Sequence, residues 1–282
     1  MKRTTAHCLA LTIALTAAAG CTSSDGPDED DGDRRKPPRA LLAALRSVER
    51  STDGADSAKV ESTTVMGTEL SLEADGALGW GDGLTGTLTI TYTGGTTAET
   101  MRDLGVTSME ARYLPDAYYA RMGDTFAEQT GGKHWIRYAY DDLDDLGGGA
   151  AANFADQMRS AAPNQSVKLL LASADVHKIG EEKVRGKHTT HYSGTVAVGD
   201  LADAELKELL QQAGVTTQTV DIWVDDQDLL IKKTEQGRLA TGHLTQTAYY
   251  SDYGVQVTAA EPPASDTEDF RELLKKQGGS AS

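Results

Sequence analysis

Regular alternation of apolar and polar side chains is the feature that most constrains the fold of this chain. Between residues 70 and 80, and again between residues 87 and 93, apolar residues occupy most alternate positions, and threonine, serine or a carboxylate occupies most positions between them. Successive side chains of a strand point to opposite faces of its sheet, so each segment predicts an antiparallel strand with one solvated face. The pair Asp82-Gly83 between them favours a tight turn, which places the two strands side by side.

Weaker patterns continue along the chain. They predict further strands at residues 109–114, 118–122, 134–138, 176–179, 183–198, 219–224, 229–235 and 239–250, with Val255 and Val257 closing the sheet. Helical spacing of apolar residues predicts helices at residues 41–51, around 154–158 and 167–171, and at 202–213, and a capping box at 265–268 predicts a last short helix. The predicted fold class is therefore α+β.

The N-terminus has the composition of a secretory signal. Lys2 and Arg3 precede an apolar stretch from Leu9 to Ala19, which is shorter than the roughly 20 residues that a membrane-spanning helix needs. The tetrad that ends at Cys21 resembles the bacterial lipobox, which implies lipid attachment to Cys21 and residence on the outer face of the cell membrane. The alternative is an ordinary cleaved signal that leaves Cys21 as a free thiol.

The residues after Cys21 set the organisation of the mature chain. We expect a signal at 1–20, a disordered acidic tether at 21–38, a single domain at 39–276 and a loose tail at 277–282. Cys8, the other cysteine, leaves with the signal, so no internal disulfide is possible. Loss of Lys2 and Arg3 lowers the formal net charge from −16 to −18, and such a surface repels nucleic acid. We expect a monomer.

Motifs for catalysis, metals and cofactors give no support to an enzyme. Gly81-x-Gly83-x-x-Gly86 precedes a strand and not the helix that a dinucleotide site requires. His188 and His191 fall on opposite faces of a predicted strand. The acidic runs at 141–145 and 225–228 lack the spacing of a calcium loop. We expect no catalytic residue, metal or cofactor.

Spaced aromatic and apolar positions over most of the mature chain resemble the LppX and LprG family of actinobacterial lipoproteins, which are relatives of the LolA and LolB carriers. The segments that carry the resemblance are 118–122 with 132–135, 186–194, and 220–225 with 229–233. The resemblance implies a strongly curved, half-open antiparallel β-barrel with helices packed against its concave, open side.

The resemblance also implies a function. Its better-known members hold acyl chains or lipidated molecules in the hollow, so we expect a membrane-anchored protein that binds a hydrophobic ligand. The alternative is a sensor or protein-interaction scaffold with a filled core. The residues expected to line the cavity are Leu70, Leu72, Leu88, Ile90, Tyr92, Ile222 and Val224.

Overall fold

The computed structural model describes residues 37–279 except for 146–161, 202–203, 213 and 240–241. The predicted signal, Cys21 and most of the predicted tether lie outside the described residues, as does the helix expected around residues 154–158. Among the helices that are described, none combines the length and the apolar character needed to cross a membrane.

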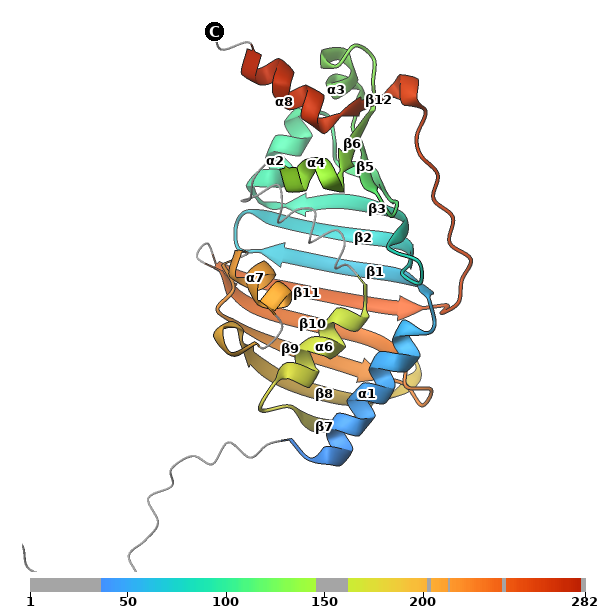
Figure 1. The fold of residues 1–282 in the computed structure, drawn as a ribbon, viewed down its shortest axis with the longest axis vertical. Coiled ribbons are helices and arrows are strands. Elements are labelled where there is room, and N and C mark those ends of the chain that lie inside the picture. The colour runs from blue at the N-terminus through green and yellow to red at the C-terminus, as the bar shows by residue number, and fades with distance from the viewer. Residues whose placement is uncertain (1–36, 146–161, 202–203, 213, 240–241, 280–282) are drawn as a thin grey trace, which may run out of the picture. The chain divides into compact units, whose positions relative to one another are not determined.

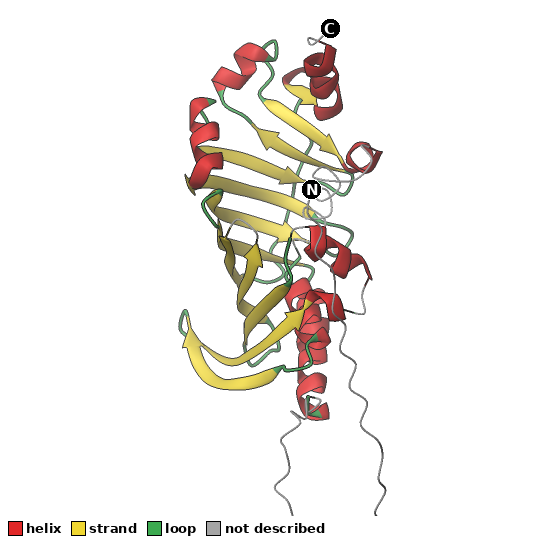
Figure 2. Cartoon of the chain, turned by 90° about the vertical axis from the view of Figure 1, so that its left-hand side faces the viewer, coloured by secondary structure: helices red, strands yellow, loops and turns green. Residues whose placement is uncertain are grey.

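The described strands form a 12-stranded sheet with the order β12-β6-β5-β4-β3-β2-β1-β11-β10-β9-β8-β7. Neighbours are antiparallel except for β12 and β6, which are parallel. The sheet is open and curved (Figures 1 and 2). Its strands are β1 (Ser57–Met66), β2 (Leu70–Gly79), β3 (Thr85–Gly94), β4 (Ser108–Tyr113), β5 (Ala117–Arg121), β6 (Trp135–Ala139), β7 (His177–Val184), β8 (Lys187–Ala197), β9 (Thr217–Val224), β10 (Leu230–Leu239), β11 (Gly242–Ser251) and β12 (Thr267–Asp269).

Helices cover one face of this sheet. Figures 1 and 2 show α1, α6 and α7 on the same side of the strands, with α4 and α8 toward the β6 end. We call the covered face the inner face and the opposite one the outer face. The helices are α1 (Arg39–Asp53), α2 (Gly95–Asp103), α3 (Asp124–Gln129), α4 (Tyr140–Asp145), α6 (Asn164–Ala172), α7 (Ala204–Gln212) and α8 (Phe270–Gly279).

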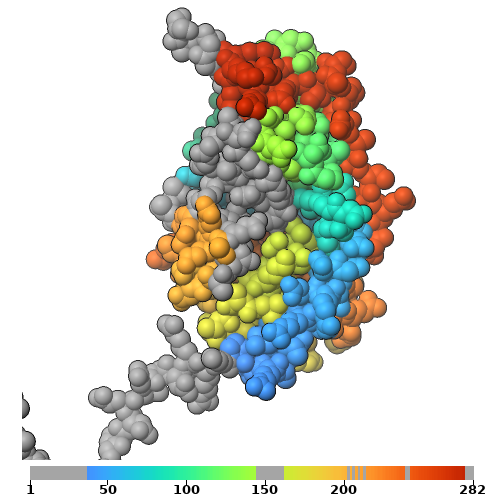
Figure 3. Space-filling model, viewed as in Figure 1, coloured from blue at the N-terminus to red at the C-terminus, as the bar shows by residue number. Residues whose placement is uncertain are grey.

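The apolar stripes of α1 and α6 bury the inner face of the C-terminal strands. Leu45 of α1 and Leu170 of α6 are each 0 % exposed and belong to the same core cluster as Ile222 of β9. Gly194 of β8 permits this close packing, because a Cβ at that position would lie 3.0 Å from Leu170 Cδ2 and 2.9 Å from Ser173 Oγ. Figure 3 shows α1 and α6 side by side on this side of the molecule, with α7 on the same side.

The outer face is held by charged and aromatic side chains. Lys232 Nζ lies 3.8 Å from the ring centre of Trp223, and the guanidinium of Arg185 lies 3.9 Å from that of Tyr249. Arg185 occupies the tip of the β7–β8 hairpin with φ of 50°, and its two terminal nitrogens each donate to Glu61 at 2.8 Å. These cation–π and ionic contacts fasten the hairpin tip across the sheet.

The predicted fold class is confirmed, and the helix near residues 41–51 and the strand pair β2–β3 are present. Two predictions for the C-terminal segment are wrong. Val255 and Val257 lie in an extended segment outside the sheet, and the capping-box residues form a 3₁₀ turn and β12, so α8 begins only at Phe270. Pairing of residues 267–269 with β6 outweighs the local helix signal.

The α6 interface supplies the first prediction. We expect Leu170→Ala to lower the free energy of unfolding by about 2–5 kcal/mol, because it removes a fully buried side chain and leaves a cavity. Urea denaturation followed by circular dichroism measures the change. Leu274→Ala is the control, since Leu274 is 37 % exposed, and a loss of similar size in both variants would contradict the packing described here.

Candidate functional site

The inner face has a sealed half, formed by the strands beneath α1 and α6. Ile222 is 0 % exposed and Val224 is 4 % exposed. Both belong to the cluster that includes Val48 of α1 and Val167 of α6. Helix side chains therefore occupy the place that a ligand would take in this half.

The other half, over β2 to β6, presents apolar side chains that are only partly buried. Leu72, Tyr92, Met109, Met122 and Tyr138 pack against the core cluster and keep intermediate exposure. Tyr92 donates a weak hydrogen bond to Met109 Sδ at 3.5 Å. Long, adaptable and aromatic side chains of this kind favour contact with hydrocarbon.

Aromatic rings continue this surface to the C-terminal helix. Tyr113 and Tyr118 lie 5.1 Å apart between ring centres, Tyr118 and Tyr138 lie 5.9 Å apart, and Tyr138 and Phe270 of α8 lie 4.8 Å apart. We name this surface, six half-buried residues together with the buried Tyr113 and Tyr118, the aromatic patch. It comprises Leu72, Tyr92, Met109, Tyr113, Tyr118, Met122, Tyr138 and Phe270.

The aromatic patch is electrically neutral at physiological pH. Burial raises the pKa of Tyr138 to about 12 and raises the pKa of Tyr118 well above its ordinary value. Their hydroxyl groups therefore stay protonated. A surface without ionised groups can accept an uncharged chain without stripping water from a charge.

The structure divides the seven residues that the sequence suggested as a cavity lining. It brings Leu72 and Tyr92 opposite each other on β2 and β3, and places Leu88 and Ile90 as buried neighbours on β3. Leu70 is half-buried at the start of β2. Ile222 and Val224 lie in the sealed half.

Six of the eight patch residues are absent from the lining that the sequence predicts, and these include Tyr113 and Tyr118. Met109, Met122 and Tyr138 lie in or beside predicted strands, so their alternation was a usable signal. Phe270 reaches the patch from the far end of the chain, and no local pattern indicates that contact.

Two open hollows lie on the outer face. One has a volume of about 420 Å³ and includes Glu61, Glu73, Asp75, Arg185 and Tyr249 in its wall. The other has a volume of about 300 Å³ and shares Thr89 with the first. Its wall includes Met109 and Met122 of the aromatic patch beside Glu110, Arg121 and Asp124. The wall of the first hollow is charged and hydroxylated, so it suits solvent better than hydrocarbon.

Histidines and carboxylates do not gather into a metal centre in the part of the chain that the structure describes. His191 instead stacks on Trp223 with ring centres 4.2 Å apart. Its Nε2 lies 2.8 Å from Asp221 Oδ1. Asp225 accepts hydrogen bonds from the backbone of Gln227 and Leu229, as expected of an acidic turn.

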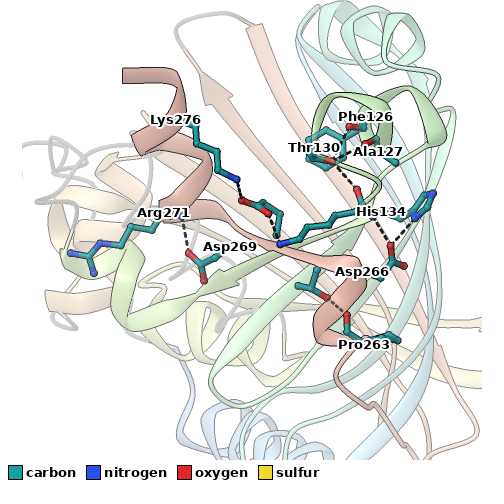
Figure 4. A network of polar contacts seen from close by, with 12 residues as sticks. Phe126, Ala127, Thr130, His134, Pro263, Asp266, Asp269, Arg271 and Lys276 are labelled. Carbon is teal, nitrogen blue, oxygen red and sulfur yellow. Dashed lines mark hydrogen bonds and ion pairs between the residues drawn. The ribbon is translucent and has the colours of Figure 1, made fainter. Parts of the chain in front are cut away.

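A polar network attaches the C-terminal segment to β6 and so positions Phe270 (Figure 4). Glu268 has only 4 % of its side chain exposed and accepts hydrogen bonds from Lys133 at 2.6 Å and Lys276 at 2.5 Å. His134 contacts Asp266 at 2.7 Å. We call these contacts the C-terminal clamp.

The clamp predicts a pH-dependent stability. Hydrogen bonds from Lys133 and Lys276 hold the pKa of Glu268 below its usual value. Its contribution is therefore complete above the unfolded pKa of about 4.3 and is lost as the pH falls through the lower folded pKa. We expect Glu268→Gln to lower the free energy of unfolding by about 1–2 kcal/mol at pH 7, and the difference from wild type to shrink below about pH 4.

Denaturation at pH 7 and pH 3 measures this effect. Glu272→Gln is the matched control, because Glu272 is 53 % exposed and pairs with Lys275, which is 61 % exposed. A pH-independent difference for Glu268→Gln would contradict the assignment.

No family model matches the chain. A Streptomyces coelicolor protein named "Putative lipoprotein SCO4650" is 59 % identical over 300 residues, which cover 99 % of this chain and 100 % of that one. A Streptomyces griseus protein named "Uncharacterized 31.2 kDa protein in rplA-rplJ intergenic region" is 55 % identical over 249 residues, covering 84 % of this chain and 81 % of that one.

Two solved structures share the architecture. LprF from Mycobacterium bovis superposes with a TM-score of 0.52 at 13 % identity and covers 81 % of this chain and 100 % of its own. LppX from Mycobacterium tuberculosis gives a TM-score of 0.52 at 17 % identity, with 79 % and 100 % covered. The chain therefore has the LppX-type lipoprotein fold that the sequence resemblance implied.

Proposed function

The chain belongs to the same family as these Streptomyces proteins, and on that premise we propose that it is an extracytoplasmic lipoprotein, anchored through Cys21, that binds an acyl chain at the aromatic patch. The observation that carries the proposal is the neutral character of the patch, six of whose eight residues are half-buried, on the inner face of an LppX-type sheet. No catalytic residue is part of the proposal.

Burial of hydrocarbon is sufficient to drive such binding. Each buried CH₂ contributes about 0.8 kcal/mol, so a chain of about a dozen carbons gives a gross gain of about 10 kcal/mol. Losses of translational and conformational freedom reduce this figure. The net binding free energy that remains is compatible with a ligand that stays bound and can still exchange.

Binding is tested with the mature chain carrying Cys21→Ser and produced without its signal. We expect native mass spectrometry to find co-purified lipid, and a fluorescent fatty acid to bind saturably. Tyr92→Asp places a charge in the aromatic patch and is expected to weaken binding at least tenfold. Thr89→Asp adds the same charge to the outer face of the same strand, and equal loss in both variants would contradict the assigned face.

The anchor is tested separately in cells. Because Cys21 supplies the sulfur for acylation, we expect Cys21→Ser to abolish labelling by a clickable palmitate and to remove the lipid-dependent membrane retention of the protein. The wild-type chain and a Thr22→Ser variant are the positive controls. Labelling that persists in Cys21→Ser would refute the attachment site.

A scaffold or sensor with a filled core is the second candidate. It is supported by the sealed half of the inner face, where Ile222 and Val224 are covered by helices. This reading predicts that extraction yields no lipid and that Tyr92→Asp acts on stability alone.

A further inference from the structure

The edge of the sheet at β6 binds an extended segment of the chain itself. Strand β12 adds to β6 in parallel over three residues, starting with Thr267 opposite Trp135. Just before these residues, the backbone nitrogen of His134 donates to the carbonyl oxygen of Asp266 at 3.1 Å. This arrangement is β-strand addition, which is also a common way for a protein to bind a peptide of another chain.

Basic side chains mark the edge that receives this segment. We name them the basic edge, and they are Lys133, His134 and Arg137. Lys133 and His134 immediately precede β6, and Arg137 lies within it. The basic edge is a local exception, because the whole chain carries a formal net charge of −16. Its charge attracts anionic groups.

Each member of the basic edge contacts an acidic side chain in or beside β12. The C-terminal clamp supplies two of these contacts, and in the third Arg137 Nη1 lies 3.2 Å from Asp269 Oδ2. His134 binds Asp266 through two nitrogens, since its backbone N donates to Oδ1 at 2.9 Å and its Nδ1 lies 2.7 Å from the same oxygen (Figure 4). Main-chain pairing and charge therefore favour the same segment.

Few apolar contacts hold this segment in place. We name residues 264–279, which comprise a 3₁₀ turn, β12 and α8, the docking segment. Its 3₁₀ turn has no buried residue, and Phe270 and Leu273 of α8 are only half-buried. A segment with so little buried apolar surface opens at a lower free energy than the core. Parallel pairing, moreover, is slightly less stable per residue than antiparallel pairing.

The stretch between β11 and the docking segment is attached by its own contacts (Figure 1). Ser57 Oγ donates to the carbonyl oxygen of Val255 at 2.6 Å, and Arg112 Nη1 donates to that of Ala260 at 2.9 Å. Pro262, near its end, is buried. Opening of the docking segment can therefore begin at the exposed 3₁₀ turn and leave this stretch in place.

Opening uncovers both parts of a peptide-binding site. It removes an acidic partner from each member of the basic edge, and it frees the outer edge of β6 for main-chain pairing. Among the described residues, Asp116 remains 3.7 Å from Arg137, and Asp124, which is 97 % exposed, remains 3.6 Å from His134. An unpaired strand edge is a template for another extended chain.

We propose that the basic edge is a docking site for an acidic, extended segment of a partner protein, and that the docking segment occupies this site when the partner is absent. The contacts in cis define the partner's chemistry. Its segment adds to β6 in parallel, with acidic side chains at the positions of Asp266, Glu268 and Asp269 and an aromatic one at that of Phe270. The inference does not depend on lipid binding, because strand addition and ion pairing at β6 need no lipid.

Occupation in cis sets the apparent affinity for the partner. Only the open fraction of molecules can bind, so the apparent dissociation constant equals the intrinsic constant divided by that fraction. Weakening the contacts in cis therefore strengthens binding of the partner. Because the ring centres of Phe270 and Tyr138 lie 4.8 Å apart, the exchange also alters one end of the aromatic patch.

Hydrogen exchange tests the opening in the mature chain carrying Cys21→Ser. Mass spectrometry compares amides of the docking segment with those of β2 and β3. We expect the amides of β12 and α8 to exchange at least about tenfold faster, because they open without global unfolding. Protection equal to that of β2 and β3 would overturn the proposal.

A fluorescent peptide with the sequence of residues 263–274 serves as the probe of the basic edge, and anisotropy measures its binding. Asp266→Asn combined with Glu268→Gln in the chain weakens the docking segment and leaves the basic edge unchanged. We expect the probe to bind this variant about tenfold more tightly than the chain without these two substitutions, because a larger fraction of molecules is open. Equal or weaker binding by the variant would refute cis occupation of the site.

Charge and position are then tested in the same variant. We expect about tenfold weaker binding when the probe carries Asp266→Asn, Glu268→Gln and Asp269→Asn, and when the chain also carries Lys133→Gln. Lys178→Gln is the matched control and is expected to leave binding unchanged, because Lys178 is 48 % exposed on β7 at the opposite end of the sheet. Equal binding of both probes, or equal loss in both lysine variants, would overturn the assignment.

Light scattering decides whether a second copy of the chain is the occupant instead. We expect a monomer at the concentrations used for binding. A dimer that disappears in the variant with Asp266→Asn and Glu268→Gln would assign the basic edge to the docking segment of a second copy and overturn the partner. Thermal denaturation of each variant confirms that it is folded.

Discussion

Antiparallel pairing of β1 with β11 is the interaction on which the described structure depends. Strands β2 to β6 follow from β1 in chain order, and strands β7 to β10 lead to β11. The ladder from Lys59 opposite Ser251 to Met66 opposite Leu244 joins these two meanders into one sheet. Since β1 also pairs with β2 over its whole length, a defect in β1 separates the two halves of the inner face.

The same ladder sets the polarity of the inner face. The two ends of the inner face are apolar: α1 and α6 close one end, and the aromatic patch forms the other. The strands β1 and β11, which join these ends, present Ser62, Thr64 and Gln246 on the inner face. Polar groups at core-facing positions reduce the stability that apolar residues would supply. Departures of this kind from the usual burial pattern are expected where function imposes its own demand.

Local periodicity in the sequence was sufficient to predict β2 and β3, because most of their inner positions are apolar and most of their outer positions are threonine, serine or a carboxylate. It overlooked β1 because Ser62 and Thr64 occupy inner positions and hide the alternation. It also gave no indication that Lys233 and Glu235 face inward, since a single-residue bulge between Leu230 and Lys232 inverts the phase of β10. Ile222 has the pattern of a lining residue, but the helices that cover it are placed by tertiary packing.

The aromatic patch is complete only when the sheet is complete. Tyr92 comes from the middle of the sheet, Tyr138 from β6, and Phe270 from the helix that follows β12. Phe270 is held there because β12 pairs with β6 and because Glu268 binds Lys133 and Lys276. The residues that the structure describes include no cysteine that could fix this arrangement, so the C-terminal clamp couples the aromatic patch to folding of the last strand.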